Sequence, residues 1–479
     1  MNDTPKTLTP DVCVIGAGSG GLSVAAAVAS FGVPVVLIEK DKMGGDCLNT
    51  GCVPSKALLA AGKHAQTIRN ATKFGVTISG DIKINHQKVH DHVHQVIAAI
   101  APNDSVERFT SLGVHVIKAT AKFKDKNTVV AGDHEIRARR FVVATGSKAF
   151  VPPIPGINDV PYFTNENIFE NTRKIGHLIV VGGGPIGMEM AQAHRRLGSE
   201  VTVIEGLKVL GKDDPELASI VVDQIRKEGI AIHEDAMVLA VEKRGKTGVR
   251  VRFKIGENEH QVDGTHLLIA TGRAVNVEGI GLEEAGIAYD RKGIKVNADL
   301  RTTNRKVYAI GDVAGGLQFT HVAGYHAGLV VRGLLFRKKA VPDNHIIPWV
   351  TYTDPELAHV GMNEEEAKAK YNQITVLRWP FHENDRAQAE RKTEGMVKLV
   401  TTRKGKILGA TIVGAGAGEM INMWALALAN SMKVGDVVSY VPPYPTMSEA
   451  GKRAVVTYYV PLTRKPLVRW IINMLRKFG

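Results

Sequence analysis

Residues 11–39 read DVCVIGAGSGGLSVAAAVASFGVPVVLIE. An apolar run ends at a glycine cluster, a helical pattern follows and stops at a further glycine, and a second apolar run ends in Glu39. This order of strand, glycine turn, helix and strand is typical of a βαβ unit. The turn carries the fingerprint Gly16-x-Gly18-x-x-Gly21, which predicts a dinucleotide with its pyrophosphate on the helix N-terminus and its ribose on the acid.

The same pattern returns in the segment LIVVGGGPIGMEMAQAHRRLGSEVTVIE, which covers residues 178–205. Its turn reads Gly182-x-Gly184-x-x-Gly187, and Glu205 follows the first glycine by 23 residues, as the acid of the first unit does. Two such units predict two dinucleotides, or one dinucleotide and a degenerate copy. The acid favours a free ribose 2′-hydroxyl and so NADH, while a lysine three positions further on leaves NADPH open.

The composition excludes several classes of protein. A chain of 479 residues is long enough for roughly two to four domains. The net charge of +13 fits a solvated basic surface, because no nucleic-acid-binding motif accompanies it. Three cysteines are too few for the disulfide framework of a secreted protein, and no stretch reaches the about eighteen apolar residues of a membrane span. We therefore expect a cytoplasmic protein with no nucleic-acid partner.

A close cysteine pair lies in the segment GGDCLNTGCVPSK, residues 44–56. Cys47 and Cys52 are five positions apart and can close a small disulfide loop at the start of a helix. Lys56 lies one helical turn after Cys52, and both a helix N-terminus and a lysine stabilise the reactive thiolate. The segment therefore predicts a redox-active pair rather than two structural cysteines.

This segment resembles the active-site signature of the class I pyridine nucleotide–disulfide oxidoreductases, which include dihydrolipoamide dehydrogenase, glutathione reductase and mercuric reductase. Other motifs resemble the family in the same order along nearly the whole chain. ATGS at 144–147 and ATGR at 270–273 resemble its nucleotide-domain motifs. YAIGDVAGGLQFTHVA at 308–323 resembles its second FAD motif, and YTDPELAHVG at 352–361 the start of its dimerisation domain.

The resemblance implies an α/β fold with two Rossmann-like dinucleotide-binding domains and a C-terminal α+β dimerisation domain, assembled as a homodimer. The expected divisions are an FAD-binding domain in two parts (1–160 and 281–345), an NAD(P)-binding domain (161–280), an interface domain (346–460) and a basic amphipathic tail (461–479).

The resemblance also implies an electron path from NAD(P)H through FAD to the cysteine pair. Cys52 is then the charge-transfer thiol, Cys47 is the interchange thiol, and Lys56 pairs with Glu189. The residues expected to bind FAD are Gly16, Gly18, Gly21, Glu39, Lys40, Gly45, Lys56, Ala121, Thr145, Gly146, Ser147, Gly311, Asp312, Phe319, Thr320 and His321. Those expected to bind NAD(P) are Gly182, Gly184, Ile186, Gly187, Glu205 and Gly272.

The sequence departs from the family's disulfide-reducing members at its C-terminal motif. Tyr444 stands where they carry a histidine, while Pro445 and Glu449 remain, and we expect Tyr444 and Glu449 to be catalytic. An ordinary tyrosine titrates near ~10, so it is a poor proton shuttle at neutral pH. Mercuric reductases also carry tyrosine there, but the C-terminal cysteine pair that captures their metal is absent.

The acceptor therefore stays open. One reading is a mercuric-reductase-like core that reduces a disulfide, a soft metal ion or a quinone. The alternative is a dihydrolipoamide dehydrogenase.

Two weaker features remain. His86, His90 and His94 recur every four residues, but no cysteine or well-placed carboxylate completes a ligand set, so we expect a solvated helix face and no metal site. The tail PLTRKPLVRWIINMLRKFG is basic and amphipathic. It fits a helix packed on the dimer, a helix on a membrane surface, or a helix that docks a partner and makes the chain a recruited redox module.

Overall fold

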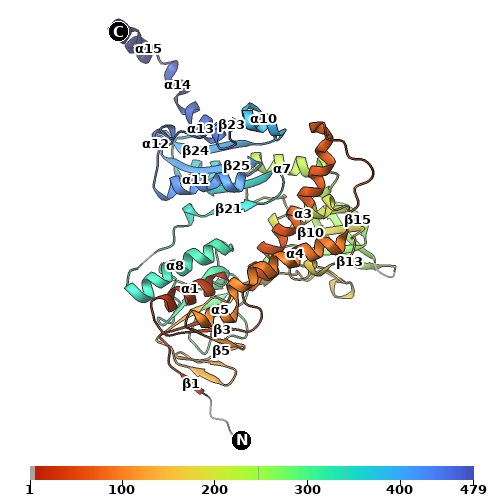
Figure 1. Cartoon of the computed structure of the whole chain (residues 1–479), viewed down its shortest axis with the longest axis vertical. Helices are drawn as coiled ribbons and strands as arrows, with labels where there is room; N and C mark the ends of the chain where they lie inside the picture. Colours follow the sequence, from red (N-terminus) through yellow and green to blue (C-terminus); the bar gives the residue numbers. More distant parts are fainter. Residues whose placement is uncertain (1–5, 246–247, 340, 479) are drawn as a thin grey trace. The chain divides into compact units, whose positions relative to one another are not determined.

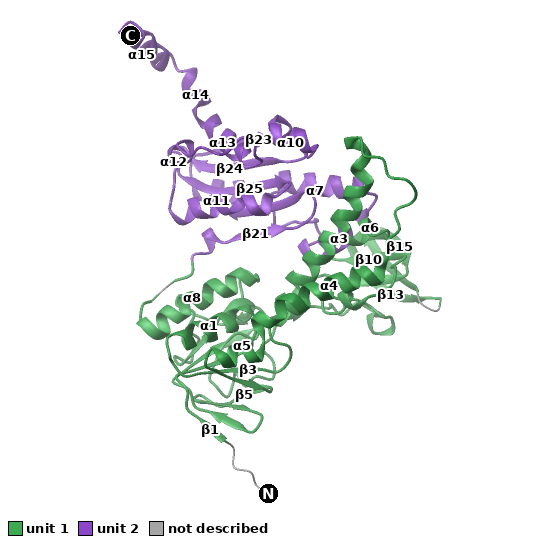
Figure 2. Cartoon of the chain, in the orientation of Figure 1, with its two compact units in different colours: residues 1–182, 193–204, 236–342 green, residues 183–192, 205–235, 343–479 purple. Residues whose placement is uncertain are grey.

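The computed structural model describes residues 6–245, 248–339 and 341–478. The chain divides into two compact units, each assembled from separate stretches of sequence (Figure 2). Unit 1 contains residues 1–182, 193–204 and 236–342, and unit 2 contains residues 183–192, 205–235 and 343–479.

Unit 1 contains a five-stranded sheet in the order β20-β8-β2-β3-β4, in which every neighbouring pair is parallel. Its central strands are fully buried and read as continuous apolar runs, as parallel strands covered on both faces do. Helices α1 and α8 lie side by side (Figure 1). The bounds are β2 Val12–Ile15, α1 Ser19–Ser30, β3 Val35–Glu39, β4 Val114–Lys118, β8 Arg140–Val143, β20 Val307–Ala309 and α8 Thr320–Phe336.

A second parallel sheet contains the second fingerprint. Strand β10 (His177–Val181) pairs in parallel with β11 (Glu200–Ile204) and with β16 (His266–Ile269). Helix α6 (Pro185–Arg196) connects β10 to β11, so the predicted βαβ unit is confirmed. The smaller sheets of unit 1 are antiparallel except for β1, which pairs in parallel with β7. Their strands include β1 Lys6–Leu8, β5 Ala121–Asp125, β6 Thr128–Ala131, β7 His134–Ile136, β9 Ser147–Ala149, β13 Ala236–Arg244, β14 Gly248–Ile255, β15 Asn258–Gly264 and β17 Arg273–Val275.

The C-terminal part of unit 2 is built on a five-stranded antiparallel sheet, ordered β21-β22-β25-β24-β23. Trp424 and Phe381 are fully buried in its core. Three strands expected from the sequence are confirmed here, so the α/β fold with an antiparallel C-terminal domain stands. The bounds are β21 Pro348–Thr351, β22 Glu356–Gly361, β23 Ile374–Pro380, β24 Met396–Thr402, β25 Ile407–Gly414, α7 Pro215–Lys227, α9 Glu364–Lys370, α10 Asp385–Glu390, α11 Ala417–Ala429, α12 Val434–Val438 and α13 Glu449–Val456.

The C-terminal tail forms two short helices, α14 (Val460–Thr463) and α15 (Pro466–Leu475). No residue of α15 is buried. Across the described ranges, no helix is both long enough and apolar enough to span a bilayer.

Candidate functional site

The first glycine turn is closed by contacts that exclude any side chain. Gly16 has φ +104°, and a Cβ there would lie 2.5 Å from the carbonyl oxygen of Ala144. A Cβ on Gly21 would lie 1.8 Å from the carbonyl oxygen of Gly16. Gly18 faces open space, and α1 has no side-chain cap, so its first backbone N–H groups are available to a phosphate.

The acid that ends β3 is held against this turn. Glu39 accepts a hydrogen bond from the backbone N–H of Ala17 at 2.6 Å and from that of Asp41 at 2.8 Å. The carboxylate is therefore fixed at the carboxyl end of the strand, where the ribose of a bound dinucleotide lies. The turn, the open Gly18 and this acid together fit the adenosine and pyrophosphate of FAD.

Other predicted FAD residues follow β8 and β20, whose carboxyl ends lie at the same edge of the sheet. The Ser147 hydroxyl donates to the Asp312 carboxylate, and Arg273 Nε donates to the same hydroxyl oxygen at 2.7 Å. The Arg273 guanidinium also lies 3.1 Å from Asp46. Burial raises the pKa of Asp312, against the effects of Ser147 and Arg273. Arg273 was missed as a site residue, although it is the last letter of the ATGR motif.

A buried histidine supports the second FAD motif. Gly311, which has φ +67°, donates its backbone N–H to His326 Nδ1 at 3.3 Å. Burial lowers the pKa of His326, so the ring is the neutral acceptor that this bond needs. His326 was not predicted, because a histidine inside an apolar helix looks the same as any core residue.

The remaining predicted FAD residues surround the same strand edge. Lys40 is exposed directly after Glu39, whereas Ala121 is a buried core residue at the start of β5. Phe319 and His321 flank the start of α8 with their rings stacked 5.3 Å apart. Thr145 and Gly146 follow β8, and the Thr145 hydroxyl donates to the carbonyl of Asn276 at 2.8 Å.

The two cysteines lie in consecutive helices. Cys47 lies in α2 (Gly45–Asn49), and Cys52 opens α3 (Cys52–Asn70). Both are thiols in the structure, which is the reduced form of the pair. A hydrogen bond from Cys47 lowers the pKa of Cys52 to about 6, helped by Thr320 and Lys56 and opposed by partial burial. The Thr320 hydroxyl lies 3.3 Å from the Cys52 sulfur. Cys52 is therefore the thiolate of the pair at neutral pH.

The same hydrogen bond and burial raise the pKa of Cys47, which stays protonated while Cys52 carries the charge. The two thiols of the pair therefore differ in charge at neutral pH.

The cysteine loop is fastened to the first glycine turn. Gly44 forms a β-bridge with Gly18, and its backbone N–H donates to the carbonyl of Ala17 at 2.9 Å. A Cβ on Gly45 would lie 2.8 Å from the Cα of Gly18, so the approach needs glycine. Within the loop, the Asn49 side chain donates to the carbonyl of Gly45 at 2.8 Å. The pyrophosphate turn and the cysteines therefore form one rigid structure.

The second fingerprint repeats the geometry of the first. Glu205 accepts from the backbone N–H of Gly183 at 2.6 Å and from that of Leu207 at 2.8 Å. Gly182 has φ +114°, and a Cβ on Gly184 would meet no atom within 4 Å. Gly187 and Ile186 lie in the first turn of α6, and Gly272 has φ +128° after β16.

Lys208, the lysine near the second acid, is already paired. Its ammonium lies 2.6 Å from Asp235, and this hydrogen bond raises the pKa of the lysine. Its charge is therefore balanced within unit 2 by a neighbouring carboxylate.

The four remaining predicted residues are placed as follows. Lys56 belongs to unit 1, in α3, and Glu189 to unit 2, where it accepts from the backbone N–H of Tyr352 at 2.9 Å. The Tyr444 hydroxyl donates to Asp385 at 2.7 Å, and this bond raises the pKa of the tyrosine. Glu449 opens α13 and pairs with Arg453, one turn further on, at 2.9 Å.

Known proteins resemble the chain along almost its full length. The pattern of the pyridine nucleotide-disulphide oxidoreductases matches residues 10–327, and that of their dimerisation domain matches residues 347–455. A mercuric reductase of Bacillus cereus is 34% identical over 94% of this chain and 71% of its own length. A dihydrolipoyl dehydrogenase of Bacillus subtilis is 33% identical over 92% of this chain and 94% of its own length.

A solved structure gives the same picture. The HOCl-induced flavoprotein disulfide reductase RclA from Escherichia coli superposes with a TM-score of 0.83 at 27% identity, over 93% of this chain and 99% of its own.

Proposed function

The chain belongs to the pyridine nucleotide–disulphide oxidoreductase family, whose members are NAD(P)H-dependent flavoprotein disulfide reductases, and from this premise we propose its electron path. Bound FAD supplies two-electron transfer between the nicotinamide and the disulfide. Cys52 is the thiolate next to the flavin, and Cys47 is the thiol that meets the acceptor. This assignment is supported by the place of Cys52 at the first residue of α3, with the Thr320 hydroxyl 3.3 Å from its sulfur. A hydrogen bond from Cys47 there lowers the pKa of Cys52 to about 6.

The experiment is an anaerobic NADH titration of the oxidised holoenzyme, followed by absorbance. We expect the wild type to develop a long-wavelength thiolate–flavin band as the electrons of NADH reduce the disulfide. Cys47→Ser, which keeps the Cys52 thiol but cannot form the disulfide, should show the band before NADH is added and lose it as NADH reduces the flavin. Cys52→Ser should show no such band at any stage. The two variants are matched controls for each other, because each replaces one cysteine sulfur of the same loop by oxygen. Full bleaching of the flavin with no such band in the wild type would show that the cysteines are not on the electron path.

We propose that the acceptor is a small disulfide, a soft metal ion or a quinone, as in a mercuric-reductase-like core. Tyr444 favours the metal ion or the quinone, because its bond to Asp385 raises its pKa further above neutrality and so makes it a poor proton shuttle. The rival is dihydrolipoamide dehydrogenase, which the similarity to the Bacillus subtilis enzyme keeps open. Steady-state assays with dihydrolipoamide, Hg²⁺ and a quinone separate the two. Fast dihydrolipoamide turnover would overturn our choice.

We propose NADH as the preferred reductant. The Glu205 carboxylate is fixed by two backbone N–H groups, and Asp235 balances the charge of Lys208. A 2′-phosphate would then meet the Glu205 carboxylate, while the ammonium of Lys208 is already paired with Asp235. The comparison of kcat/KM for NADH and NADPH tests this, and equal values would contradict it.

The dimerisation domain supports a homodimer. Within each subunit we propose the sequence-based boundaries, with FAD bound by 1–160 and 281–345, NAD(P)H by 161–280, and the subunit interface in 346–460. The pairing of Lys56 with Glu189, and catalytic roles for Tyr444 and Glu449, belong to the same proposal.

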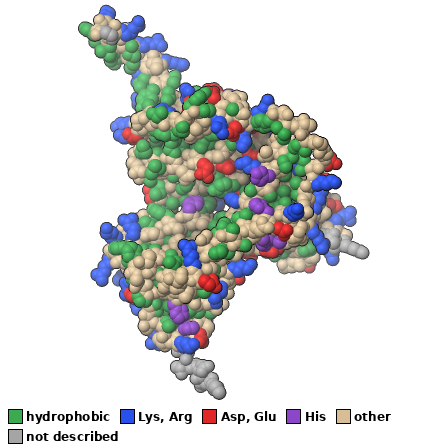
Figure 3. Space-filling model, viewed as in Figure 1, with side chains coloured by type: hydrophobic (Ala, Val, Ile, Leu, Met, Phe, Trp, Pro, Cys, Tyr) green, Lys and Arg blue, Asp and Glu red, His purple; other side chains and the backbone are tan. Residues whose placement is uncertain are grey.

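A second proposal concerns recruitment by the tail, and one observation favours it. Every apolar side chain of α15 is at least partly accessible, with Leu467 66% and Trp470 59% exposed. Residues 461–479 contain no Asp or Glu, and they follow the stretch that matches the dimerisation domain. Figure 3 shows basic and hydrophobic side chains next to one another on this tail, at the top of the view.

This combination fits peripheral contact with an anionic membrane surface, since apolar side chains enter the interface and basic ones meet the headgroups. Co-sedimentation with anionic and with neutral vesicles tests it, using the full chain and a truncation before Pro461. We expect binding only for the full chain with anionic vesicles. Equal, negligible sedimentation of both chains would rule out membrane contact and leave a partner protein or the dimer itself as the docking surface.

A further inference from the structure

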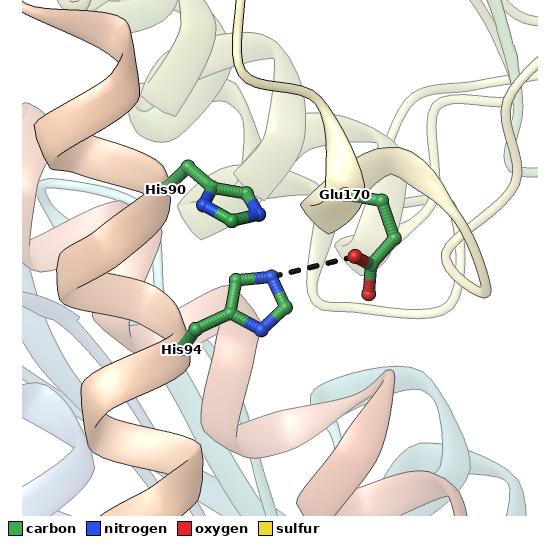
Figure 4. A group of neighbouring side chains, drawn as sticks. All are labelled: His90, His94 and Glu170. Atoms are coloured by element: carbon green, nitrogen blue, oxygen red, sulfur yellow. Dashed lines mark ion pairs between the residues drawn. The ribbon is translucent and has the colours of Figure 1, made fainter.

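Two histidines of unit 1 face the same way from helix α4 (His86–Ile100). His90 and His94 are one turn apart, and their ring centroids are 4.1 Å from each other. Positions i and i+4 share a helix face, so both rings project towards the same point. Figure 4 shows the two rings one above the other on the same side of the helix, inclined to each other, with the Glu170 carboxylate opposite them.

That carboxylate comes from a segment far away in sequence. Glu170 ends the 3-10 helix η4 (Ile168–Glu170), and its Oε2 lies 3.6 Å from His94 Nε2. One nitrogen from each histidine and one oxygen of Glu170 all lie within 4.8 Å of one another. From the sequence we expected no metal site, because no carboxylate completed the set, and the fold supplies one.

A second carboxylate is placed to orient one of the rings. Asp91 Oδ1 lies 3.3 Å from His90 Nδ1 and also accepts from the Gln87 side chain at 2.8 Å. Metal-binding histidines commonly hold their other ring nitrogen against a carboxylate in this way, which fixes the ring and leaves Nε2 as the ligand. His94 Nε2 is 3.3 Å from the carbonyl of Phe169, a long contact that a bound ion would replace.

An independent observation comes from the cavity beside the cluster. His194 is 7% exposed and lines this cavity together with His86 and His90. Its Nε2 has no hydrogen-bond partner among the described residues. Burial, with His86 nearby, lowers the pKa of His194 to about 4, so the ring is neutral at physiological pH. A buried polar atom without a partner indicates that a further group, such as water on an ion, occupies the cavity.

We propose that His90, His94 and Glu170 form a binding site for one divalent transition-metal ion of the zinc class, which joins α4 to η4. Two imidazoles and a carboxylate suit Zn²⁺ far better than Mg²⁺ or Ca²⁺, which take oxygen ligands. Zinc bonds of about 2.0–2.2 Å place ligands about 3.3 Å apart, so the three side chains close by rotation. The Glu170 side chain is 64% exposed and free to turn inwards.

The site is separate from the redox pair but connected to it through packing. Helix α4 packs against α3, the helix that Cys52 opens, and Leu58 of α3 lines the same cavity. A bound ion would therefore fix the position of α4 on the helix that presents the charge-transfer thiol. The role proposed for the ion is structural, and the ion takes no part in electron transfer.

The experiment is calorimetric titration of Zn²⁺ into the oxidised FAD holoenzyme, in which the disulfide keeps the two cysteines from binding metal. We expect one zinc per subunit, and at least tenfold weaker binding in His94→Ala and in Glu170→Gln. His92→Ala is the matched control, because His92 lies on the same helix, is exposed and is not part of the cluster. It should bind zinc as the wild type does.

Two further measurements keep the result decisive. Thermal unfolding without zinc establishes that each variant is folded, and Glu170→Gln changes an exposed side chain without altering its size. The double variant Cys47→Ser/Cys52→Ser should retain the zinc site. Loss of binding in that double variant, absence of a stoichiometric site in the wild type, or unchanged affinity in His94→Ala and Glu170→Gln would each overturn the proposal.

Discussion

The two glycine turns of this chain have the same local structure and different surroundings. In each, the acid that ends the second strand accepts one hydrogen bond of 2.6 Å from the residue after the first glycine. It accepts another of 2.8 Å from the residue two positions after itself. Glu39 and Glu205 thus hold their turns in the same way. The backbone structure of each turn therefore follows from the βαβ sequence and is the same for either nucleotide.

The difference lies in what each returning segment carries. In both units the chain comes back over the turn: Gly44 donates its backbone N–H to the carbonyl of Ala17 at 2.9 Å, and Leu210 donates to that of Gly183 at 3.0 Å. The first returning segment delivers the cysteines, whereas the second leads to α7, whose N-cap Asp214 is 2.7 Å from Lys398 of β24. The first turn is therefore fastened to the redox pair, and the second to the ion pairs of unit 2.

The largest expected effect comes from a substitution in the first glycine turn. Gly21→Ala would drive a methyl group into the Gly16 carbonyl, so we expect FAD content to fall at least tenfold and stability by about 4 kcal/mol. Flavin absorbance and urea unfolding measure both. Gly184→Ala is the matched control, because its Cβ would meet no atom, and it should retain FAD. A yellow, stable Gly21→Ala protein would contradict the role assigned to this turn.

The next effect concerns the ion pairs around Lys398, which contact the N-terminal turn of α7. Lys398 is buried and contacts Asp214, Glu216 and Glu364. Lys398→Met would leave the buried Asp214 carboxylate without its cation, at a cost of about 3 kcal/mol. Arg378→Met, which removes a half-exposed partner of the same Glu216, should cost only about 1 kcal/mol. Similar losses in both variants would show that the buried lysine has no special role.

The ion pairs around Lys398 should make the stability of the fold depend on pH. A hydrogen bond from Arg378 and the Lys398 contacts lower the pKa of Glu216 to about 2, and bonds from Lys368 and Lys398 do the same for Glu364. Carboxylates with a lowered folded-state pKa stabilise the fold fully above the unfolded value, about 4.5, and lose that contribution as pH falls to about 2. The stability difference between wild type and Lys398→Met should therefore shrink over that window. A difference that stays constant down to pH 2 would contradict this origin.

A smaller effect separates the two nucleotides directly. Glu205→Ala removes the fixed carboxylate of the second turn, so KM for NADH should rise about tenfold, equivalent to ~1.4 kcal/mol, with FAD content unchanged. Glu39→Ala should do the reverse and lower FAD content. Kinetics and flavin absorbance on the same two preparations test the assignment. A loss of FAD in Glu205→Ala would show that the second turn, and not the first, binds FAD.

The smallest effect is a change in titration. In the reduced enzyme the long-wavelength band should appear as pH rises through about 6, the lowered pKa of Cys52. Thr320→Val removes a donor 3.3 Å from that sulfur and should move the midpoint upwards to about 7. Ser55→Ala, on the same helix but hydrogen-bonded to the Cys52 carbonyl instead, should leave it unchanged. An unmoved midpoint in Thr320→Val would remove Thr320 from the site.

The sequence predicted what depends on short-range patterns. The βαβ units, with their acids, lie within about thirty residues and are confirmed, as are the C-terminal strands and the tail helix. It did not predict Arg273, whose contacts with Asp46 and Ser147 join residues more than a hundred positions apart. It also missed Glu170 beside His94, because the two residues are 76 positions apart in the sequence. Local periodicity shows which face a residue lies on, but only the packed fold shows what that face meets.

The position of β20 at one edge of the unit 1 sheet affects how the protein is made. Strand β20 pairs with β8, which ends at residue 143, and β20 begins at residue 307, so about 160 residues are synthesised between them. At ~5–20 residues per second, a ribosome takes roughly 8–33 s over this interval. During that time β8 has an open edge that can pair with another chain. The yield of this protein should therefore depend on translation speed and on chaperones that protect the nascent chain.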